Sequence, residues 1–282
     1  MAKRNTEWTL IKYKKYLKEG RGQGEGVDYK PWLITQDFPS MGTATRVFSN
    51  KTKRMHHFFS NIQLMYFFLL DWEQSVIDIR EHYPLHDLNN IFGNDEDLRL
   101  DKFIDKKNNI PYIITTTFLI TFLQEGKTKH TARSIKYASE LEKKITQEKL
   151  EIERRYWQAK GVDWGVVTNK DINMVKAKNI EFMHTYIKLE NRKSDELESV
   201  SELSEGLYMR LKQEKNSIIN ILKRFDSDYD LEQGSSLSIF KYLLTNRRIC
   251  VDMGKPISLK MTSKAIEFPC HDYKGVDNEI YS

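Results

Sequence analysis

Three groups of side chains in this sequence have the types and spacing needed for chemistry. His56 and His57 are adjacent, Asp95-Glu96-Asp97 is an acidic run, and Glu142-Lys143-Lys144 fits a Glu-x-Lys pattern. Neighbouring residues of a strand point to opposite faces, so packing or a phosphate contact is favoured for the histidines over joint metal binding. We interpret the acidic run as a solvated loop, and Glu142 as part of a helix cap.

The cysteines and the apolar segments exclude several protein classes. Cys250 and Cys270 are the two cysteines, and no Cys-x-x-Cys or Cys/His cluster is present, which argues against a structural zinc site. The first residues contain no apolar leader, and Leu64–Leu70 is the longest apolar stretch, far below the roughly 20 residues that cross a bilayer. With 39% hydrophobic and 30% charged residues in 282, we expect a cytoplasmic globular protein of one or two domains with no membrane contact.

Positive charge is concentrated at the start of the chain. The net charge is +5, and residues 1–54 contain 12 basic and 5 acidic side chains. A basic front end suits a polyanion such as DNA, although a solvated surface with a basic tail has the same composition. The side chains expected to contact DNA phosphates are Lys12, Lys14, Lys15, Lys18, Arg21, Lys53, Arg54 and His56.

The elements that must position these residues form an α/β pattern. Residues 1–42 are basic and glycine-rich, and their alternating glycines favour an exposed arm or loop, here taken as an arm. Residues 43–169 then predict a hairpin (43–59), a helix capped by Ser60 (61–72), strands at 76–79, 111–123 and 130–138, a helix opened by a capping box at Ser139–Glu142, and a strand at 162–168, with a loop at 86–109. The order matches the αβββαβ core of restriction-endonuclease-like nucleases, an order that many other α/β domains share.

The pattern of apolar and charged residues changes near residue 170. Residues 171–225 are helical and mixed in charge, and an amphipathic helix follows around Phe240. Residues 248–253 and 257–261 flank a Gly254-Lys255-Pro256 turn and predict a hairpin. Helices followed by a hairpin suggest that residues 170–282 form a winged-helix-like domain.

Five stretches of the sequence carry a family resemblance. They are KEGRGQGEGVDYKPWL (18–33), RMHHFFS (54–60), VIDIREHYPL (76–85), LEIERRYWQAK (150–160) and YDL (229–231). In this order they resemble the TnsA family, the endonuclease subunits of heteromeric cut-and-paste transposases. The combination of GRGQG, DYKPWL and DIREHYPL is highly specific, whereas the likeness is weak beyond about residue 235.

The resemblance implies a fold, an activity and partners. It implies a restriction-endonuclease-like domain followed by a winged-helix-like domain. It implies cleavage of the 5′ strand at each transposon end, beside a TnsB transposase that cuts the 3′ strand. It also implies contacts to a TnsB-like transposase and to a TnsC-like AAA+ ATPase, the latter through the C-terminal part, in the DNA-associated setting of the bacterial cytoplasm.

The resemblance also locates the catalytic positions. Such nucleases hold one or two Mg²⁺ with a Glu on the first core helix and an Asp on the second core strand, and use a Lys on the third. These positions fall on Gln63, Thr117 and Lys136, and the position two before the lysine is Ser134. The lysine is retained and both acids are absent. Glu153 matches an acidic position that lies close to the site in the family.

Neutral oxygens are poor substitutes for carboxylates around Mg²⁺. We therefore expect no bound metal and absent or severely reduced cleavage, in a pseudonuclease that joins TnsB-like and TnsC-like proteins or pairs with an active TnsA-like paralogue. The alternative is a working Mg²⁺-dependent 5′-strand nuclease that uses Glu153 with Lys136. Other carboxylates within plausible reach are Glu73, Asp78, Glu140 and Glu142. A third hypothesis is a DNA-binding regulator that has no transposase partner.

Overall fold

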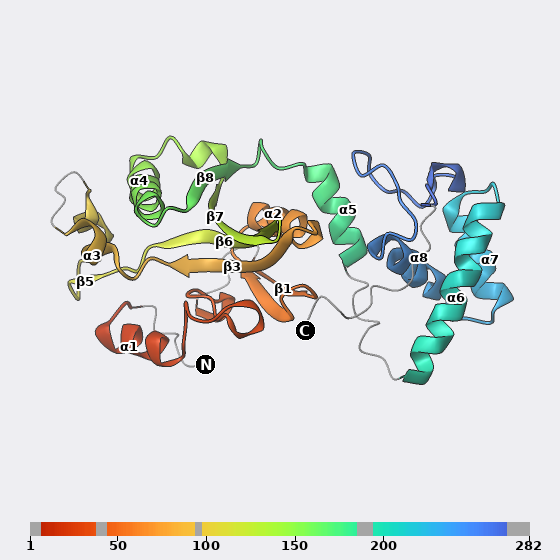
Figure 1. The fold of residues 1–282 in the computed structure, drawn as a ribbon, viewed down its shortest axis with the longest axis horizontal. Helices are drawn as coiled ribbons and strands as arrows, with labels where there is room; N and C mark the ends of the chain where they lie inside the picture. The colour runs from red at the N-terminus through yellow and green to blue at the C-terminus, as the bar shows by residue number, and fades with distance from the viewer. Residues whose placement is uncertain (1–6, 38–43, 94–97, 185–193, 270–282) are drawn as a thin grey trace. The chain divides into compact units, whose positions relative to one another are not determined.

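The computed structural model describes residues 7–37, 44–93, 98–184 and 194–269, which divide into two compact units between Asn173 and Met174. Figure 1 shows the elements along the chain. The first unit contains α1 (Leu10–Lys18), β1 (Thr45–Ser49), β2 (Arg54–Phe58), α2 (Asn61–Trp72), β3 (Val76–Pro84), α3 (Leu88–Phe92), β4 (Ile104–Asp105), β5 (Ile110–Pro111), β6 (Thr115–Gln124), β7 (Lys127–Lys136), α4 (Lys144–Ala159) and β8 (Asp163–Thr168).

A four-stranded mixed sheet forms the centre of the first unit. Its strand order is β3-β6-β7-β8, in which β3, β6 and β7 are antiparallel neighbours and β7 pairs with β8 in parallel. The parallel pairing runs from Thr131 opposite Asp163 to Lys136 opposite Thr168. A parallel neighbour requires a crossover connection, which α4 supplies. The predicted order of helix, three strands, helix and strand is therefore present.

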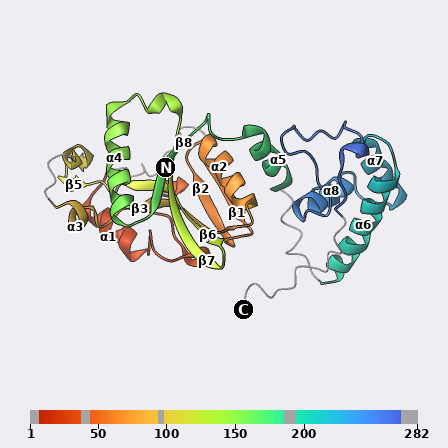
Figure 2. The same ribbon diagram turned by 45° about the horizontal axis from the view of Figure 1, so that its top comes forward.

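Helix α4 covers one face of this sheet, and helix α2 and the β1–β2 hairpin cover the other (Figures 1 and 2). On β6, Phe118 faces the hairpin and α2, with its ring centroid 6.2 Å from that of Phe58 and 5.9 Å from that of Tyr66. The next residue, Leu119, and its β7 partner Ala132 belong to the apolar cluster that includes α4. This alternation is the period-two pattern of a strand buried on both faces.

The N-terminal segment packs against the sheet and is not the exposed arm predicted from its glycines. Trp8, Tyr16 and Trp32 are buried in one aromatic cluster. Tyr29 is buried as well, and its hydroxyl donates a hydrogen bond to the backbone carbonyl of Glu81 on β3 at 3.0 Å. The prediction was wrong because alternating glycines mark tight turns as well as loose chain.

Two of those glycines are required by close contacts. Gly22 has φ +75°, and a Cβ there would lie 2.2 Å from Cγ of Pro84. Gly24 has φ +85°, and a Cβ there would lie 2.6 Å from the backbone oxygen of Asp28. The GRGQG motif therefore lets the N-terminal segment approach the end of β3.

Some predicted boundaries also need correction. The helix that ends at Ala159 begins at Lys144 and has no Ser139–Glu142 capping box, because Ala138–Glu140 forms a separate 3-10 turn in which Glu140 accepts the backbone N–H of Tyr137. The predicted strand 76–79 extends to Pro84. The predicted loop 86–109 contains α3 and β4, whereas Asp95-Glu96-Asp97 lies outside the described residues.

The second unit is helical. Its helices are α5 (Met174–His184), α6 (Ser194–Gln213), α7 (Ile218–Asp228) and α8 (Ser235–Thr245). Buried residues such as Phe225 and Phe240 form its core. The buried carboxylate of Asp226 accepts the backbone N–H groups of Gly234 and Ser236 at 2.8 and 2.7 Å, which fixes the turn into α8.

The hairpin predicted after α8 is absent from residues 248–261. Cys250 forms an isolated antiparallel bridge with Glu267, and Thr262 forms another with Ser217. The Gly254-Lys255-Pro256 segment instead returns to α5, where the amide of Asn179 donates to the backbone oxygens of Met253 and Lys255. Among the described residues, no helix has the length and apolarity needed to span a membrane.

Phe118 tests the packing of the sheet. Phe118→Ala is expected to lower the free energy of unfolding by about 3–5 kcal/mol, because it leaves a cavity between the sheet and the hairpin. Leu123→Ala, on the exposed end of the same strand, is expected to cost less than about 1 kcal/mol. Chemical denaturation of both variants checks this, and equal losses would contradict the assigned packing.

Candidate functional site

The positions that the resemblance assigns to catalysis lie on three different elements of the first unit. Lys136 is the last residue of β7, Thr117 lies on β6, and Gln63 lies in the first turn of α2. Glu153 lies in the middle of α4 and reaches β7 through Ser134, whose hydroxyl donates a hydrogen bond to its Oε2. Glu153 of α4 therefore contacts β7 at Ser134, two residues before Lys136.

The oxygens of the two residues that the resemblance assigns to the acidic positions each accept a hydrogen bond from the backbone. Oγ1 of Thr117 accepts the N–H of Ile135 at 3.0 Å. Oε1 of Gln63 accepts the N–H of Phe59 at 3.0 Å, while the Gln63 N–H donates to the capping hydroxyl of Ser60 at 3.4 Å. Thr117 therefore links β6 to β7, and Gln63 caps α2, in a helix start that the sequence predicts correctly.

Glu153 is buried, with 1% of its surface exposed. Its second oxygen, Oε1, lies 3.8 Å from Nζ of Lys149, one turn earlier on α4. Burial lowers the pKa of Lys149, Glu153 opposes this shift, and Lys136 reinforces it by charge repulsion. The sequence analysis missed Lys149, although its i, i+4 spacing from Glu153 placed it on the same face of a helix.

Lys136 is half-buried, and no carboxylate of the described chain lies within ion-pair distance of its ammonium. His82 lies close to this cluster from β3, because the β3–β6 register places it opposite Thr117, between the pairs Glu81–Phe118 and Tyr83–Thr116. Burial lowers the pKa of His82 to about 4, and nearby Lys149 contributes in the same direction. His82 is therefore neutral at physiological pH.

The residues present do not fit Mg²⁺. The neutral oxygens of Gln63 and Thr117 already accept backbone hydrogen bonds, and the one carboxylate, Glu153, is engaged by Ser134 and Lys149. Mg²⁺ needs charged oxygen ligands and gives up its water reluctantly. Across the described ranges, no three His, Cys, Asp or Glu side chains are grouped to hold a metal ion.

Three of the predicted DNA contacts are buried. Arg54 on β2 is 7% exposed and Arg21 is also 7% exposed, while His56 is fully buried. Arg21 pairs with Asp37 and Glu19 and lies over the ring of Tyr16. These side chains hold the protein together and are not available to DNA phosphates, so the prediction was wrong for them.

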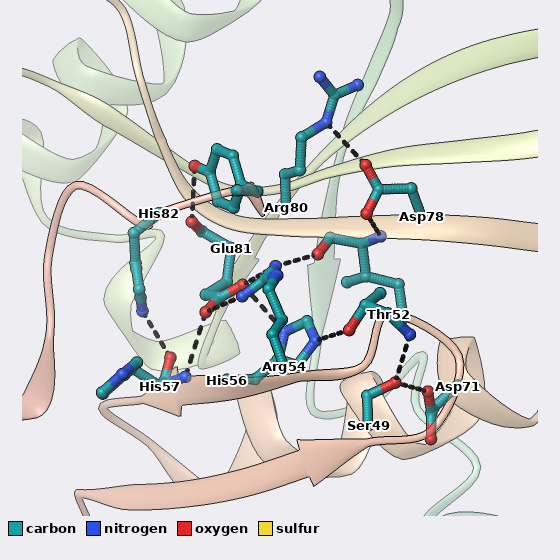
Figure 3. Close-up of polar contacts among 12 residues, drawn as sticks. Ser49, Thr52, Arg54, His56, His57, Asp71, Asp78, Arg80, Glu81 and His82 are labelled. Atoms are coloured by element: carbon teal, nitrogen blue, oxygen red, sulfur yellow. Dashed lines mark hydrogen bonds and ion pairs between the residues drawn. The ribbon is translucent and has the colours of Figure 1, made fainter. Parts of the chain in front are cut away.

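Arg54 and His56 meet at the carboxylate of Glu81, which sequence reasoning also missed (Figure 3). Nη1 and Nη2 of Arg54 lie 3.0 and 2.7 Å from the two oxygens of Glu81, and Nδ1 of His56 lies 2.9 Å from Oε2. Burial disfavours the charged form of Glu81, but the hydrogen bonds and electrostatic interactions with His56 and Arg54 outweigh it and hold its pKa well below the usual range.

The remaining predicted contacts lie on the surface. Lys14, Lys18 and Lys53 are exposed, and Lys15 is exposed beside Glu19 at 3.7 Å. Lys12 is half-buried, with its ammonium 5.8 Å from the centre of the Tyr16 ring. Of the adjacent histidines, His56 is inside and His57 partly outside, which confirms that they face opposite ways.

Two family models match the chain in sequence. The N-terminal model, TnsA-like endonuclease N terminal, matches residues 73–169, and the C-terminal model, TnsA endonuclease C terminal, matches residues 171–253. The first match contains Thr117, Lys136 and Glu153, whereas Gln63 precedes it. Together the matches cover more than half of the chain, which therefore belongs to the TnsA endonuclease family.

A single relative supports the same assignment over a longer stretch. The chain is 38% identical over 250 residues to the transposon Tn7 transposition protein TnsA of Escherichia coli, a match that covers 87% of each protein. Family membership thus extends over both units of the fold.

The Glu81 ion pairs predict a large stability effect. Glu81→Gln leaves Arg54 buried without its counter-charge and is expected to lower the free energy of unfolding by about 3–5 kcal/mol. Glu25→Gln removes the partner of Arg80 at 2.9 Å, but Glu25 is 75% exposed, so its loss is expected to cost less than about 1 kcal/mol. Urea denaturation at neutral pH separates the two, and a mild Glu81→Gln variant would show that the pair contributes little.

His82 predicts a pH dependence of stability. Its folded pKa of about 4 lies below the unfolded value of about 6.5, so the unfolded state binds more protons between these values. Stability is therefore expected to fall by roughly 3 kcal/mol as the pH drops from about 6.5 to about 4. His82→Asn, which tolerates the φ of +50° at this position, is expected to remove most of this slope. Denaturation midpoints across the range check this, and equal slopes would refute it.

Proposed function

We propose that this TnsA-type transposition protein acts in assembly at transposon ends and has lost metal-dependent cleavage of DNA. The observation that carries the proposal is the use of oxygens at the family catalytic positions. Gln63 and Thr117 accept backbone hydrogen bonds, and Glu153 is engaged by Ser134 and Lys149, so no charged oxygen is left uncommitted there for Mg²⁺. The family's catalytic residues are a Glu on the first core helix, an Asp on the second core strand and a Lys on the third. Of these three, this chain keeps the lysine, as Lys136.

The partners follow from family membership. The Tn7 relative is a transposition protein, and TnsA proteins act with a TnsB transposase and a TnsC AAA+ ATPase on transposon DNA. We propose that this chain binds transposon ends with its exposed lysines, including Lys14 and Lys53, and contacts TnsB-like and TnsC-like proteins. An active TnsA-like paralogue is a further candidate partner.

The proposed division of labour follows the two units. The helix–three strands–helix–strand order of the first unit supports a restriction-endonuclease-like domain at residues 43–169, against which residues of the described segment 7–37 are packed. We assign partner binding to residues 170–282, whose helices would serve a winged-helix-like role without the expected hairpin at 248–261.

A second function rests on Glu153. Its buried carboxylate is bonded to Ser134, two residues before Lys136, and this arrangement would suit a nuclease rebuilt around Glu153 and Lys136. Such an enzyme would cut the 5′ strand in the presence of Mg²⁺, so the two functions differ in one measurable product.

Strand-specific cleavage tests the proposal. The protein is mixed with its TnsB-like and TnsC-like partners, Mg²⁺ or Mn²⁺, and end DNA labelled on each strand in turn. We expect nicks on the 3′ strand alone, because no charged oxygen at the centre is free to hold a metal. Without 5′ cleavage the element stays joined to its donor, so cells relying on this protein are expected to yield cointegrates.

Matched variants interpret that experiment. Lys136→Ala and Glu153→Gln change the centre, and Lys144→Ala changes an exposed lysine at the start of α4. Cuts on the 5′ strand that disappear with the first two variants and persist with the third would establish the rebuilt nuclease and reject the proposal. Simple insertions in cells that contain no other 5′-cutting subunit would reject it as well.

A further inference from the structure

We infer that the second unit binds the phosphate backbone of DNA through a lysine cluster at one end of α6 and α7. This goes beyond the proposed function, in which Lys14 and Lys53 of the first unit contact DNA, and it holds whether or not the first unit cuts DNA. Part of the cluster lies beyond residue 253, where the match to the C-terminal family model ends. The lysine cluster consists of exposed residues from three segments: Lys212, Lys215, Lys223, Lys260 and Lys264.

Backbone hydrogen bonds bring the segment 258–264 to the junction between α6 and α7. The N–H of Ile219 donates to the carbonyl of Leu259 at 2.8 Å, and the N–H of Ser263 donates to the carbonyl of Asn216 at 2.9 Å. Leu259, Ser263 and Asn216 each adjoin a lysine of the cluster in the sequence. Three of the five lysines therefore lie at this junction.

The other two lysines extend the cluster along the helices. Lys212 lies in the last turn of α6, and Lys223 lies on α7 four residues after Ile219, on the same face of the helix. The two helices lie side by side (Figures 1 and 2), and Arg210 of α6 donates a hydrogen bond to Asp228 of α7 at 2.6 Å. The lysine cluster is thus held on a packed pair of helices.

The ammonium groups of the cluster are not neutralised by ion pairs. Within the described part of the chain, none of the five forms a hydrogen bond or an ion pair, and that of Lys212 lies 5.8 Å from the centre of the Tyr208 ring. The carboxylate at the junction is that of Glu214, which lies between Arg210 and Arg224, 3.7 and 3.6 Å from their guanidinium nitrogens. Two arginines therefore engage this carboxylate, and the lysines keep their charge for a ligand.

The region stays positive when every carboxylate is counted. Residues 210–228 and 258–267 contain seven basic and four acidic side chains, and Glu214 is included among the acidic ones. Acidic residues gather at the opposite end of α7 from the junction, at Asp228, Asp230 and Glu232. Although residues 170–282 have no net charge as a whole, the structure separates their charges. The junction is therefore a surface that attracts a polyanion.

The composition of the junction favours DNA phosphates over an acidic protein surface. Protein interfaces are depleted of lysine and rely on buried aromatic or aliphatic anchors. Met209 and Tyr229 are the large apolar side chains exposed in the described part of this unit, and neither belongs to the junction. Exposed hydroxyl and amide groups of Ser258, Thr262 and Asn220 accompany the lysines instead. Lysine, serine, threonine and asparagine are residue types that contact the DNA backbone.

We expect this contact to be independent of base sequence. Sequence-specific readout requires a helix or strand whose exposed side chains reach base edges in a groove. The last helix of the unit, α8, has no exposed residue, since all its residues are buried or half-buried. The lysine cluster therefore supplies the electrostatic contact to phosphates and no base readout.

Binding of a fluorescein-labelled DNA duplex by the full-length protein in EDTA tests the lysine cluster. Lys260→Gln combined with Lys264→Gln is expected to weaken binding by at least roughly tenfold, because two phosphate contacts are lost. The same variant is expected to reduce the slope of log K against log salt by about 2. The matched control is Lys178→Gln combined with Lys255→Gln, which removes two exposed lysines elsewhere in the unit and is expected to change binding less than about threefold. Circular dichroism verifies that both variants are folded.

Acetylation of lysines, measured by mass spectrometry, locates the contact on the unaltered protein. The same duplex is expected to remove most of the acetylation of Lys215, Lys260 and Lys264, because phosphates shield their ammonium groups from the reagent. Lys178 and Lys255 are expected to react equally with and without DNA. Protection confined to lysines of the first unit, together with unchanged DNA binding by the Lys260→Gln and Lys264→Gln variant, would overturn the inference.

An acidic protein partner gives a different result. If the variant at Lys260 and Lys264 binds DNA as the unaltered protein does but no longer assembles with a TnsB-like or TnsC-like protein, the cluster binds protein and the inference is wrong. The proposed function fails separately, through cleavage of the 5′ strand in Mg²⁺. Such cleavage leaves the expected DNA binding in EDTA unchanged, so each proposal is rejected by its own measurement.

Discussion

One buried carboxylate holds together three segments that are distant in sequence. Glu81 on β3 has no exposed surface, and its oxygens are shared by Arg54 and His56 of the β1–β2 hairpin. The ring of Tyr29 lies 5.0 Å from the same guanidinium group, and its hydroxyl bonds to the backbone of Glu81. Removing such charges from water is costly unless every partner is in place, so the hairpin, β3 and the N-terminal segment form one cooperative unit.

This dependence explains what the family motifs of the sequence do. Arg54 and His56 come from RMHHFFS, Glu81 comes from VIDIREHYPL, and Tyr29 comes from KEGRGQGEGVDYKPWL. All of them build the scaffold. Gln63 and Thr117, which the resemblance assigns to metal binding, lie outside these motifs. Substitutions at these two positions therefore leave the scaffold interactions of the family motifs in place.

The sequence predicted the elements well where local signals are strong. Ser60 begins α2 as expected, and the hairpin, β6, β7 and β8 follow apolar alternation and turn residues. Effects that depend on contacts between distant parts of the chain could not be predicted from the sequence. The charged half of β3 does not show alternating apolar and polar residues. Arg80 and Glu81 are adjacent and both buried, because each forms an ion pair with a residue that is distant in the sequence. The sequence located Lys136, because this residue has a family counterpart. Lys149 is recognised only in the structure, through its distance from Glu153.

The packed N-terminal segment has a consequence for how this protein is divided into parts. Trp32 and Tyr29 are almost fully buried, and Gly22 lies against Pro84 at the end of β3. A shortened chain that starts at the hairpin would uncover these surfaces and leave Arg54 without the aromatic ring beside it. A fragment of the first half therefore has to begin before Trp8 to keep these surfaces covered, and a fragment trimmed to the αβββαβ core would expose apolar surface that favours aggregation.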